Sequence, residues 1–126
     1  MKKAIIIGAS SGIGKALALE LSKRGYVIGL CARRLPLLEE VASACPSKTF
    51  IKQLDAQNAE EMRKKIEELI AEMQGVDIII YNSGIGESSS RWEKEEPMHL
   101  VNAVGFAAIA NLAYYYFKKN NIKGKL

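Results

Sequence analysis

Apolar residues in this 126-residue chain form short unbroken runs, which alternate with longer stretches where apolar residues recur every three or four positions. Unbroken runs are typical of parallel strands covered on both faces, and the wider spacing is typical of amphipathic helices. Strands are expected over residues 3–7, 26–31, 49–52 and 76–81. Helices are expected over residues 12–24, 36–45, 59–74 and about 95–119.

This alternation of strand and helix predicts an α/β protein with a Rossmann-type, doubly wound parallel sheet. We expect the four strands, numbered along the chain, to lie in the spatial order 3-2-1-4. Residues 1–126 then form a single domain that makes up half of a complete doubly wound sheet.

Two of the helices carry recognisable end signals. In the first, Ile13, Leu17 and Leu21 share one apolar stripe, which we expect to face the sheet, and Gly25 follows as a stop signal. In the third, Asn58 is suited to be the N-cap residue, with Glu61 in a capping-box position. A glycine, Gly75, is expected to end that helix.

A glycine-rich segment joins the first strand to the first helix, with the sequence Gly8-Ala9-Ser10-Ser11-Gly12-Ile13-Gly14. Glycines let the backbone turn tightly and approach a pyrophosphate, and the following helix N-terminus offers unpaired N–H groups to an anion. Hydroxyl groups of the two serines add further donors. The alternative is a tight loop that uses glycine for backbone geometry alone, but its position between strand and helix favours nucleotide binding.

The spacing of these glycines resembles the GxxxGxG cofactor loop of the short-chain dehydrogenase/reductase family. The family usually has Thr before the first glycine, and this chain has Ile7. The resemblance implies that the loop holds a nicotinamide dinucleotide. The loop residues implied in cofactor binding are Gly8, Ser10, Ser11, Gly12, Ile13 and Gly14.

The end of the second strand, Ala32-Arg33-Arg34, indicates which dinucleotide is bound. NAD-selective domains place an acidic residue near this point, but no Asp or Glu lies between Gly25 and Glu39. A guanidinium group instead grips a 2′-phosphate. We therefore expect NADP(H), with NAD(H) less favoured, and the resemblance places Arg33 at the selective position. The alternative is that both arginines are solvated loop residues.

Two further segments match the family in order and spacing. Asp55, after Leu54, resembles the Asp that accepts a hydrogen bond from the adenine amino group, although it is also suited to serve the turn before Asn58. Tyr81-Asn82-Ser83-Gly84 resembles the family motif Asn-Asn-Ala-Gly. Tyr81 and Ser83 depart from that motif. By this resemblance Asn82 braces the sheet through backbone hydrogen bonds, Gly84 and Ile85 border the ribose and nicotinamide, and Ser83 belongs to the cofactor-binding set.

Asn102 matches the family's Asn in the catalytic group Asn-Ser-Tyr-Lys, where it positions a water in the proton relay. After Asn102 the sequence has no Ser, and Tyr114 to Lys118 fits Tyr-x-x-x-Lys too early in the chain. The resemblance implies an oxidoreductase that interconverts a carbonyl and an alcohol, and we expect these 126 residues alone to be inactive. The alternative is a non-catalytic NADP(H)-binding module or sensor that acts through a protein partner.

The net charge of +4 does not indicate a nucleic-acid-binding surface. Without four lysines near the end of the chain, the remaining basic residues equal the 14 acidic residues in number, so we interpret the excess as a solvated tail. No apolar run approaches the roughly 20 residues of a membrane span. The four lysines are Lys118, Lys119, Lys123 and Lys125.

Cysteine and histidine usage predicts no metal site. Cys31 and Cys45 have no zinc-ligand spacing, and His99 is the single histidine. We expect reduced thiols in a cytoplasmic protein. A largely apolar fourth strand and a small-residue face on the last helix also predict a homo-oligomer. That face comprises Ala103, Ala107, Ala108 and Ala110.

Overall fold

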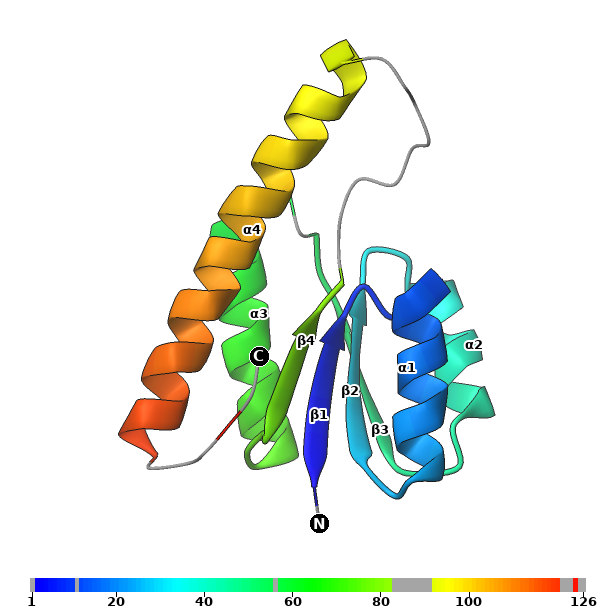
Figure 1. Ribbon diagram of the computed structural model, residues 1–126. Coiled ribbons are helices and arrows are strands. Elements are labelled where there is room, and N and C mark those ends of the chain that lie inside the picture. Colours follow the sequence, from blue (N-terminus) through cyan, green and yellow to red (C-terminus); the bar gives the residue numbers. More distant parts are fainter. Residues whose placement is uncertain (1, 11, 56, 83–91, 121–123, 125–126) are drawn as a thin grey trace.

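The computed structural model describes residues 2–10, 12–55, 57–82, 92–120 and 124, with the backbone alone over 92–104. Strands and helices alternate from the first element to the last (Figure 1). The strands are β1 (Lys3–Ile7), β2 (Val27–Ala32), β3 (Thr49–Gln53) and β4 (Ile78–Tyr81). The helices are α1 (Gly12–Lys23), α2 (Leu35–Ala44), α3 (Ala59–Met73) and α4 (Trp92–Lys119).

All three strand pairings are parallel, and the order across the sheet is β3-β2-β1-β4. The helices α1 and α2 cover one face of the sheet, and α3 and α4 cover the other (Figure 1). The predicted α/β class, parallel sheet and strand order are therefore confirmed. Because the strands run in parallel, all their carboxyl ends meet at one end of the sheet.

Burial on both faces explains why the two central strands, β1 and β2, are almost entirely apolar. Ile5 and Ile7 pack with α3 and α4, and Ala4 and Ile6 pack with α1 and α2. All six residues of β2 are buried. An alternating polar face would place unpaired polar groups under a helix, so neither central strand alternates apolar and polar residues.

The helix α3 follows its predicted signals at the start and differs at the end. The Asn58 side chain accepts a hydrogen bond from Glu61 N at 3.1 Å, as a capping box requires. At the end, the left-handed cap is Gln74 at φ 61°, and Gly75 at φ 119° follows it. Gly29 of β2 lets this helix lie close to the sheet, because a Cβ there would come within 2.8 Å of Met73 Sδ.

The predicted buried stripe of α1 is confirmed only in part, because Leu17 and Leu21 pack against the core and Ile13 does not. Ile13 is 69% exposed, and the fully buried positions of the helix are Gly14, Ala18 and Ser22. Small side chains at the line of closest approach bring α1 near the sheet, and the larger Leu17 and Leu21 pack beside that line, partly buried. Hydrophobic spacing alone cannot indicate that packing choice.

The edge strand β3 directs a charged side chain toward α3. Lys52 Nζ forms ion pairs with Glu72 at 2.6 Å and Glu68 at 3.7 Å. The hydrogen bond to Glu72 raises the pKa of Lys52, against the opposing effect of desolvation. An inward-pointing charge on an edge strand discourages pairing with a further strand. Over the described residues, no helix combines the length and apolarity that crossing a membrane requires.

Candidate functional site

The glycine-rich loop is fixed to the sheet at the carboxyl ends of its two central strands. Gly8 N and Ala9 N both donate to Cys31 O, at 2.8 and 3.1 Å. On the other side of β1, Asn82 N donates to Ile7 O at 2.8 Å. The start of the loop and the residue that follows β4 therefore flank β1 at the same end of the sheet (Figure 1).

Three glycines of the loop are required, two by their backbone angles and one by close packing. Gly8 and Gly12 adopt φ values of 92° and 59°, in the region that favours glycine. A Cβ on Gly14 would overlap the carbonyl oxygen of Gly8 and lie 3.1 Å from Asn82 Nδ2. At Gly12 the same test finds open space within 4 Å. The loop is closed toward the protein at Gly14 and open outward at Gly12, as a phosphate cradle requires.

The N-termini of α1 and α3 differ in charge. The first turn of α3 contains Glu60 and Glu61, and its N-cap is the side chain of Asn58. The first turn of α1 contains no acidic residue. The partial positive charge at the start of α1 is thus not neutralised by a carboxylate of that turn, so it can stabilise the phosphates of a ligand. The residues present fit a dinucleotide.

The arginines Arg33 and Arg34 follow β2 and are both exposed. Arg34 is the N-cap residue of α2, and its side chain makes no capping hydrogen bond. The ion pairs found among the described residues involve other side chains. Ala32, which precedes the arginines, is 8% exposed and ends the β2 strand. A buried strand thus delivers two guanidinium groups to solvent beside the glycine-rich loop.

Asp55 lies at the corresponding end of β3 and does serve a turn. Its Oδ1 accepts a hydrogen bond from Gln57 N at 2.9 Å, and its backbone oxygen accepts one from Asn58 N at 3.1 Å. Leu54, at 3% exposure, anchors the segment in the core. The turn uses one carboxylate oxygen of Asp55, so the other remains an acceptor for a ligand.

Tyr81, the last residue of β4, has a buried polar atom that the sequence did not reveal. Its hydroxyl group makes no hydrogen bond within the described part of the chain. Its ring packs edge-on against Phe106 of α4, with 5.9 Å between centroids. Burial raises the pKa of Tyr81 and keeps the phenol neutral. Periodicity predicts that Tyr81 lies in a strand, but it does not predict the surroundings of its hydroxyl.

Several predicted site residues cannot be placed in this geometry. Asn102 lies in α4, and its side chain is outside the described part. Ser10 lies in the loop and is partly buried. The predicted residues that lie outside the described part of the chain are Ser11, Ser83, Gly84 and Ile85.

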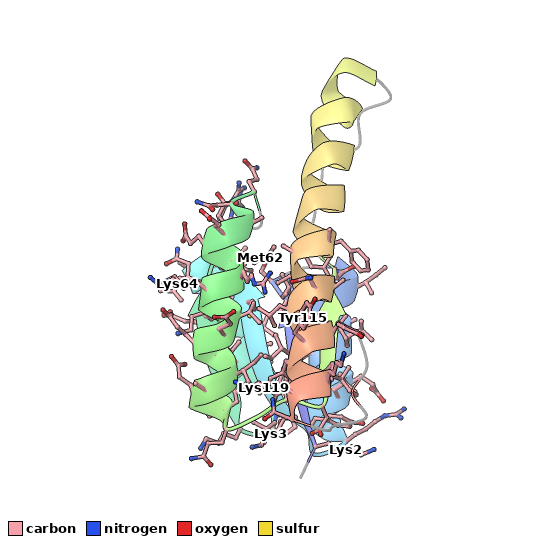
Figure 2. All side chains as sticks on the ribbon, turned by 90° about the vertical axis from the view of Figure 1, so that its left-hand side faces the viewer. Lys2, Lys3, Met62, Lys64, Tyr115 and Lys119 are labelled. Carbon is pink, nitrogen blue, oxygen red and sulfur yellow. The ribbon has the colours of Figure 1, made fainter. Side chains whose placement is uncertain are left out.

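Tyr114 and Lys118 lie at the far end of the sheet from the glycine-rich loop. The neighbouring Tyr116 accepts a hydrogen bond from Val76 N at 3.2 Å, just before the start of β4. Tyr114 is 59% exposed, and Lys118 Nζ lies 5.7 Å from its ring centroid. Figure 2 shows the same end of the molecule from the α3 and α4 side, with Lys2, Lys3 and Lys119 labelled there. The Tyr-x-x-x-Lys match is therefore a surface feature of a helix end.

In the described residues, no group of three His, Cys, Asp or Glu side chains is arranged to hold a metal ion. Cys31 is buried, and its desolvation raises the pKa of its thiol. The candidate site thus consists of a glycine cradle, a helix N-terminus, two arginines and the ends of β3 and β4.

The family model for short chain dehydrogenase matches residues 2–125. Among curated relatives, dehydrogenase/reductase SDR family member 11 of Homo sapiens is 30% identical over 131 aligned positions, covering 94% of this chain and 49% of the relative. An uncharacterised oxidoreductase of Myxococcus xanthus is 33% identical over 114 residues, covering 85% of this chain and 45% of the relative.

Solved structures of short-chain dehydrogenases are also similar to this chain. A short-chain dehydrogenase/reductase of Mycobacterium marinum has a TM-score of 0.86 at 26% identity, covering 98% of this chain and 53% of that one. The alcohol dehydrogenase of Thermococcus sibiricus, solved with 5-hydroxy-NADP, has a TM-score of 0.81 at 28% identity, with coverages of 97% and 55%. This chain spans about half the length of the relatives and structures that it matches.

Proposed function

The chain belongs to the short-chain dehydrogenase family of oxidoreductases, and from that membership we propose that it provides an NADP(H) site for the interconversion of a carbonyl and an alcohol. When bound, the nicotinamide supplies or accepts the hydride. The residues of this chain bind and orient the dinucleotide. The observation that carries the choice of NADP(H) is the exposed pair Arg33 and Arg34 at the end of β2.

In this proposal each part of the site contacts one part of the dinucleotide. The backbone of the loop at Gly12 and the N-terminus of α1 bind the pyrophosphate. Arg33, assisted by Arg34, binds the 2′-phosphate through charged hydrogen bonds. Asp55 accepts a hydrogen bond from the adenine amino group, beside the turn that it already stabilises. Asn82 braces the loop beneath the ribose, close to Gly14.

The remaining predicted contacts come from residues that flank the loop and strands, and from residues whose side chains are not described. Ala32 and Leu54 border the adenosine in this proposal, and Ile13 and the loop serines approach the phosphates. At the nicotinamide end, the proposal assigns Ser83, Gly84 and Ile85 to the border of the pocket. The proposal assigns Asn102 the role of positioning a water in the proton relay.

A titration of the 126-residue chain with NADPH and with NADH tests this proposal. A charge-assisted contact to the 2′-phosphate should make NADPH bind roughly tenfold more tightly or better. Arg33→Ala should remove most of that preference. Arg24→Ala is the matched control, because Arg24 is also exposed and its ion-pair partner among the described residues is Glu20, at 3.2 Å, at the other end of the sheet. Equal affinities for the two cofactors in the parent chain would contradict the proposal.

We further propose that these 126 residues alone bind cofactor without turnover. General acid–base catalysis typically contributes 10²–10⁴-fold, and the sequence after Asn102 contains no Ser for the group that the family resemblance implies. A panel of carbonyl substrates, followed by NADPH absorbance, should show no turnover above background. Turnover that disappears in Tyr114→Phe would contradict this proposal and make the Tyr114 and Lys118 pair catalytic.

The fourth strand and α4 support a proposal of self-association. Ile78 and Ile80 are only partly buried at the β4 edge, and Phe106 and Ala107 of α4 are exposed. Apolar edges favour pairing with a second chain. Sedimentation should therefore show dimers or larger species at high concentration, and a monomer throughout would contradict the proposal.

A further inference from the structure

The segment that carries the two arginines is held by the end of the neighbouring strand β3. Ala32 is the last residue of β2, and its register partner on β3 is Gln53. Leu54 N donates to the carbonyl oxygen of Ala32 at 3.0 Å. Gln53 Nε2 donates to the next carbonyl oxygen, that of Arg33, also at 3.0 Å. Two successive carbonyls are thus bound, and the second lies beyond the last residue of the β2 strand.

The other side of Arg33 is fixed by α2. Arg34 has extended backbone angles, φ −102° and ψ 103°, and its carbonyl oxygen accepts a hydrogen bond from Leu38 N at 3.3 Å. Pro36, in the first turn of α2, restricts the backbone further. Arg33 therefore lies between a helix start and a side-chain tether. The tether is the amide of Gln53.

We propose that Gln53 is a positioning residue for the recognition of a 2′-phosphate. Its amide holds the peptide carbonyl of Arg33, which sets the direction in which the guanidinium group leaves the end of β2. This role rests on the proposed NADP(H) site. Gln53 touches the arginine backbone and acts on the phosphate through Arg33.

The physical reason is the entropy of the arginine segment. A guanidinium group grips a phosphate through two parallel hydrogen bonds, and that geometry requires a defined backbone direction. Ordering the segment in advance lowers the conformational cost paid on binding. The exposure of Gln53 fits this role, because its amide binds an exposed backbone carbonyl and adds nothing to the core.

Gln53→Met tests the proposal, because methionine has a similar length and cannot donate a hydrogen bond. The matched control is Asn120→Leu. Asn120 Nδ2 donates to the carbonyl oxygen of Tyr116 at 2.9 Å, which is the same type of exposed amide–carbonyl bond at the opposite end of the sheet. The probes are adenosine 2′,5′-bisphosphate and adenosine 5′-monophosphate, which differ only in the 2′-phosphate. Calorimetric titration of the full 126-residue chain gives the ratio of their dissociation constants.

We expect Gln53→Met to weaken binding of the bisphosphate about threefold, the size of one exposed hydrogen bond, and to leave binding of the monophosphate unchanged. Asn120→Leu should change neither constant. A bisphosphate-to-monophosphate ratio equal to that of the parent would overturn the role of Gln53, as would equal weakening of both probes.

Arg33→Ala separates this inference from the proposal on which it rests. If Arg33→Ala raises the ratio and Gln53→Met does not, only the role of Gln53 is wrong. If Arg33→Ala leaves the ratio unchanged, Arg33 does not bind the 2′-phosphate and both proposals fall.

Discussion

The two ends of the sheet use their polar groups in opposite ways. At the amino end the polar groups bind one another. Lys3 N donates to the Asp77 carboxylate at 2.9 Å, and Lys3 Nζ donates to the Met73 carbonyl oxygen at 2.7 Å. At the carboxyl end, Arg33 and Arg34 extend into solvent, and Gly12 opens onto empty space. The polar groups of the amino end therefore stabilise the fold, and these groups of the carboxyl end are free to bind a ligand.

Serine side chains extend the contrast at the amino end. Ser22, only 2% exposed, shares a hydrogen bond of 2.6 Å with Ser47, whose hydroxyl also reaches the carbonyl oxygen of Tyr26. A hollow lies at this end too, bordered by Lys3, Asp77 and other residues. The polar groups around it already have partners. A hollow alone therefore does not identify a binding site. A binding site also needs polar groups that have no partner in the fold and can bind a ligand.

Gly14→Ala should produce the largest effect. The absence of such an effect would contradict a ligand-binding role for the carboxyl end of the sheet. The new Cβ overlaps a backbone oxygen, that of Gly8, which cannot move aside as a flexible side chain would. We expect a loss of about 1–3 kcal/mol in the free energy of unfolding, typical of overpacking. Nucleotide affinity should fall more than about tenfold. Urea denaturation and calorimetric titration measure the two quantities, and parent-like affinity would show that the loop is not the phosphate cradle.

Two tyrosine substitutions compare the ends directly. Tyr116→Phe removes the partner of Val76 N, a buried backbone donor at the amino end, and should cost about 1–2 kcal/mol of unfolding free energy. Tyr81→Phe, at the carboxyl end, removes a hydroxyl with no partner among the described residues, so we expect a change below about 0.5 kcal/mol. Chemical denaturation measures both. Equal costs would contradict the contrast, and nucleotide affinity should stay unchanged in Tyr116→Phe.

Alkaline pH should lower stability through two groups. The pKa of Lys52 is raised by its bond to Glu72, and the pKa of Tyr81 is raised by burial. For each group the pKa in the folded protein lies above the unfolded value of about 10. The group's contribution to the free energy of unfolding is therefore complete below about pH 10 and is lost as the pH rises through the folded pKa. Urea midpoints should fall above about pH 10. Lys52→Met and Tyr81→Phe should each flatten part of that fall, and a parent midpoint that rises with pH would refute the sign.

The sequence was sufficient for the fold because parallel strands and capped helices leave strong local signals. Apolar runs located β1, β2 and β4, and Asn58 with Glu61 located the start of α3. The fully buried positions of α1 were missed, since small residues there depend on how closely the helix approaches the sheet. The tether from Gln53 was missed as well, because strand register and side-chain reach arise only in the folded chain.

Asp55→Asn should have the smallest effect, because it changes a single atom at the carboxyl end of the sheet, the second carboxylate oxygen of Asp55. The asparagine retains the Oδ1 acceptor that binds Gln57 N, so the turn is preserved and the free energy of unfolding should change by less than about 0.5 kcal/mol. The amide nitrogen replaces the second carboxylate oxygen and cannot accept a hydrogen bond from an adenine amino group. Adenosine 5′-monophosphate should therefore bind about threefold more weakly. Inosine 5′-monophosphate carries a carbonyl oxygen in place of that amino group, so it should bind no more weakly than to the parent, and calorimetric titration of the two nucleotides separates these effects. Equal weakening of both nucleotides would mean that Asp55 acts through the turn alone.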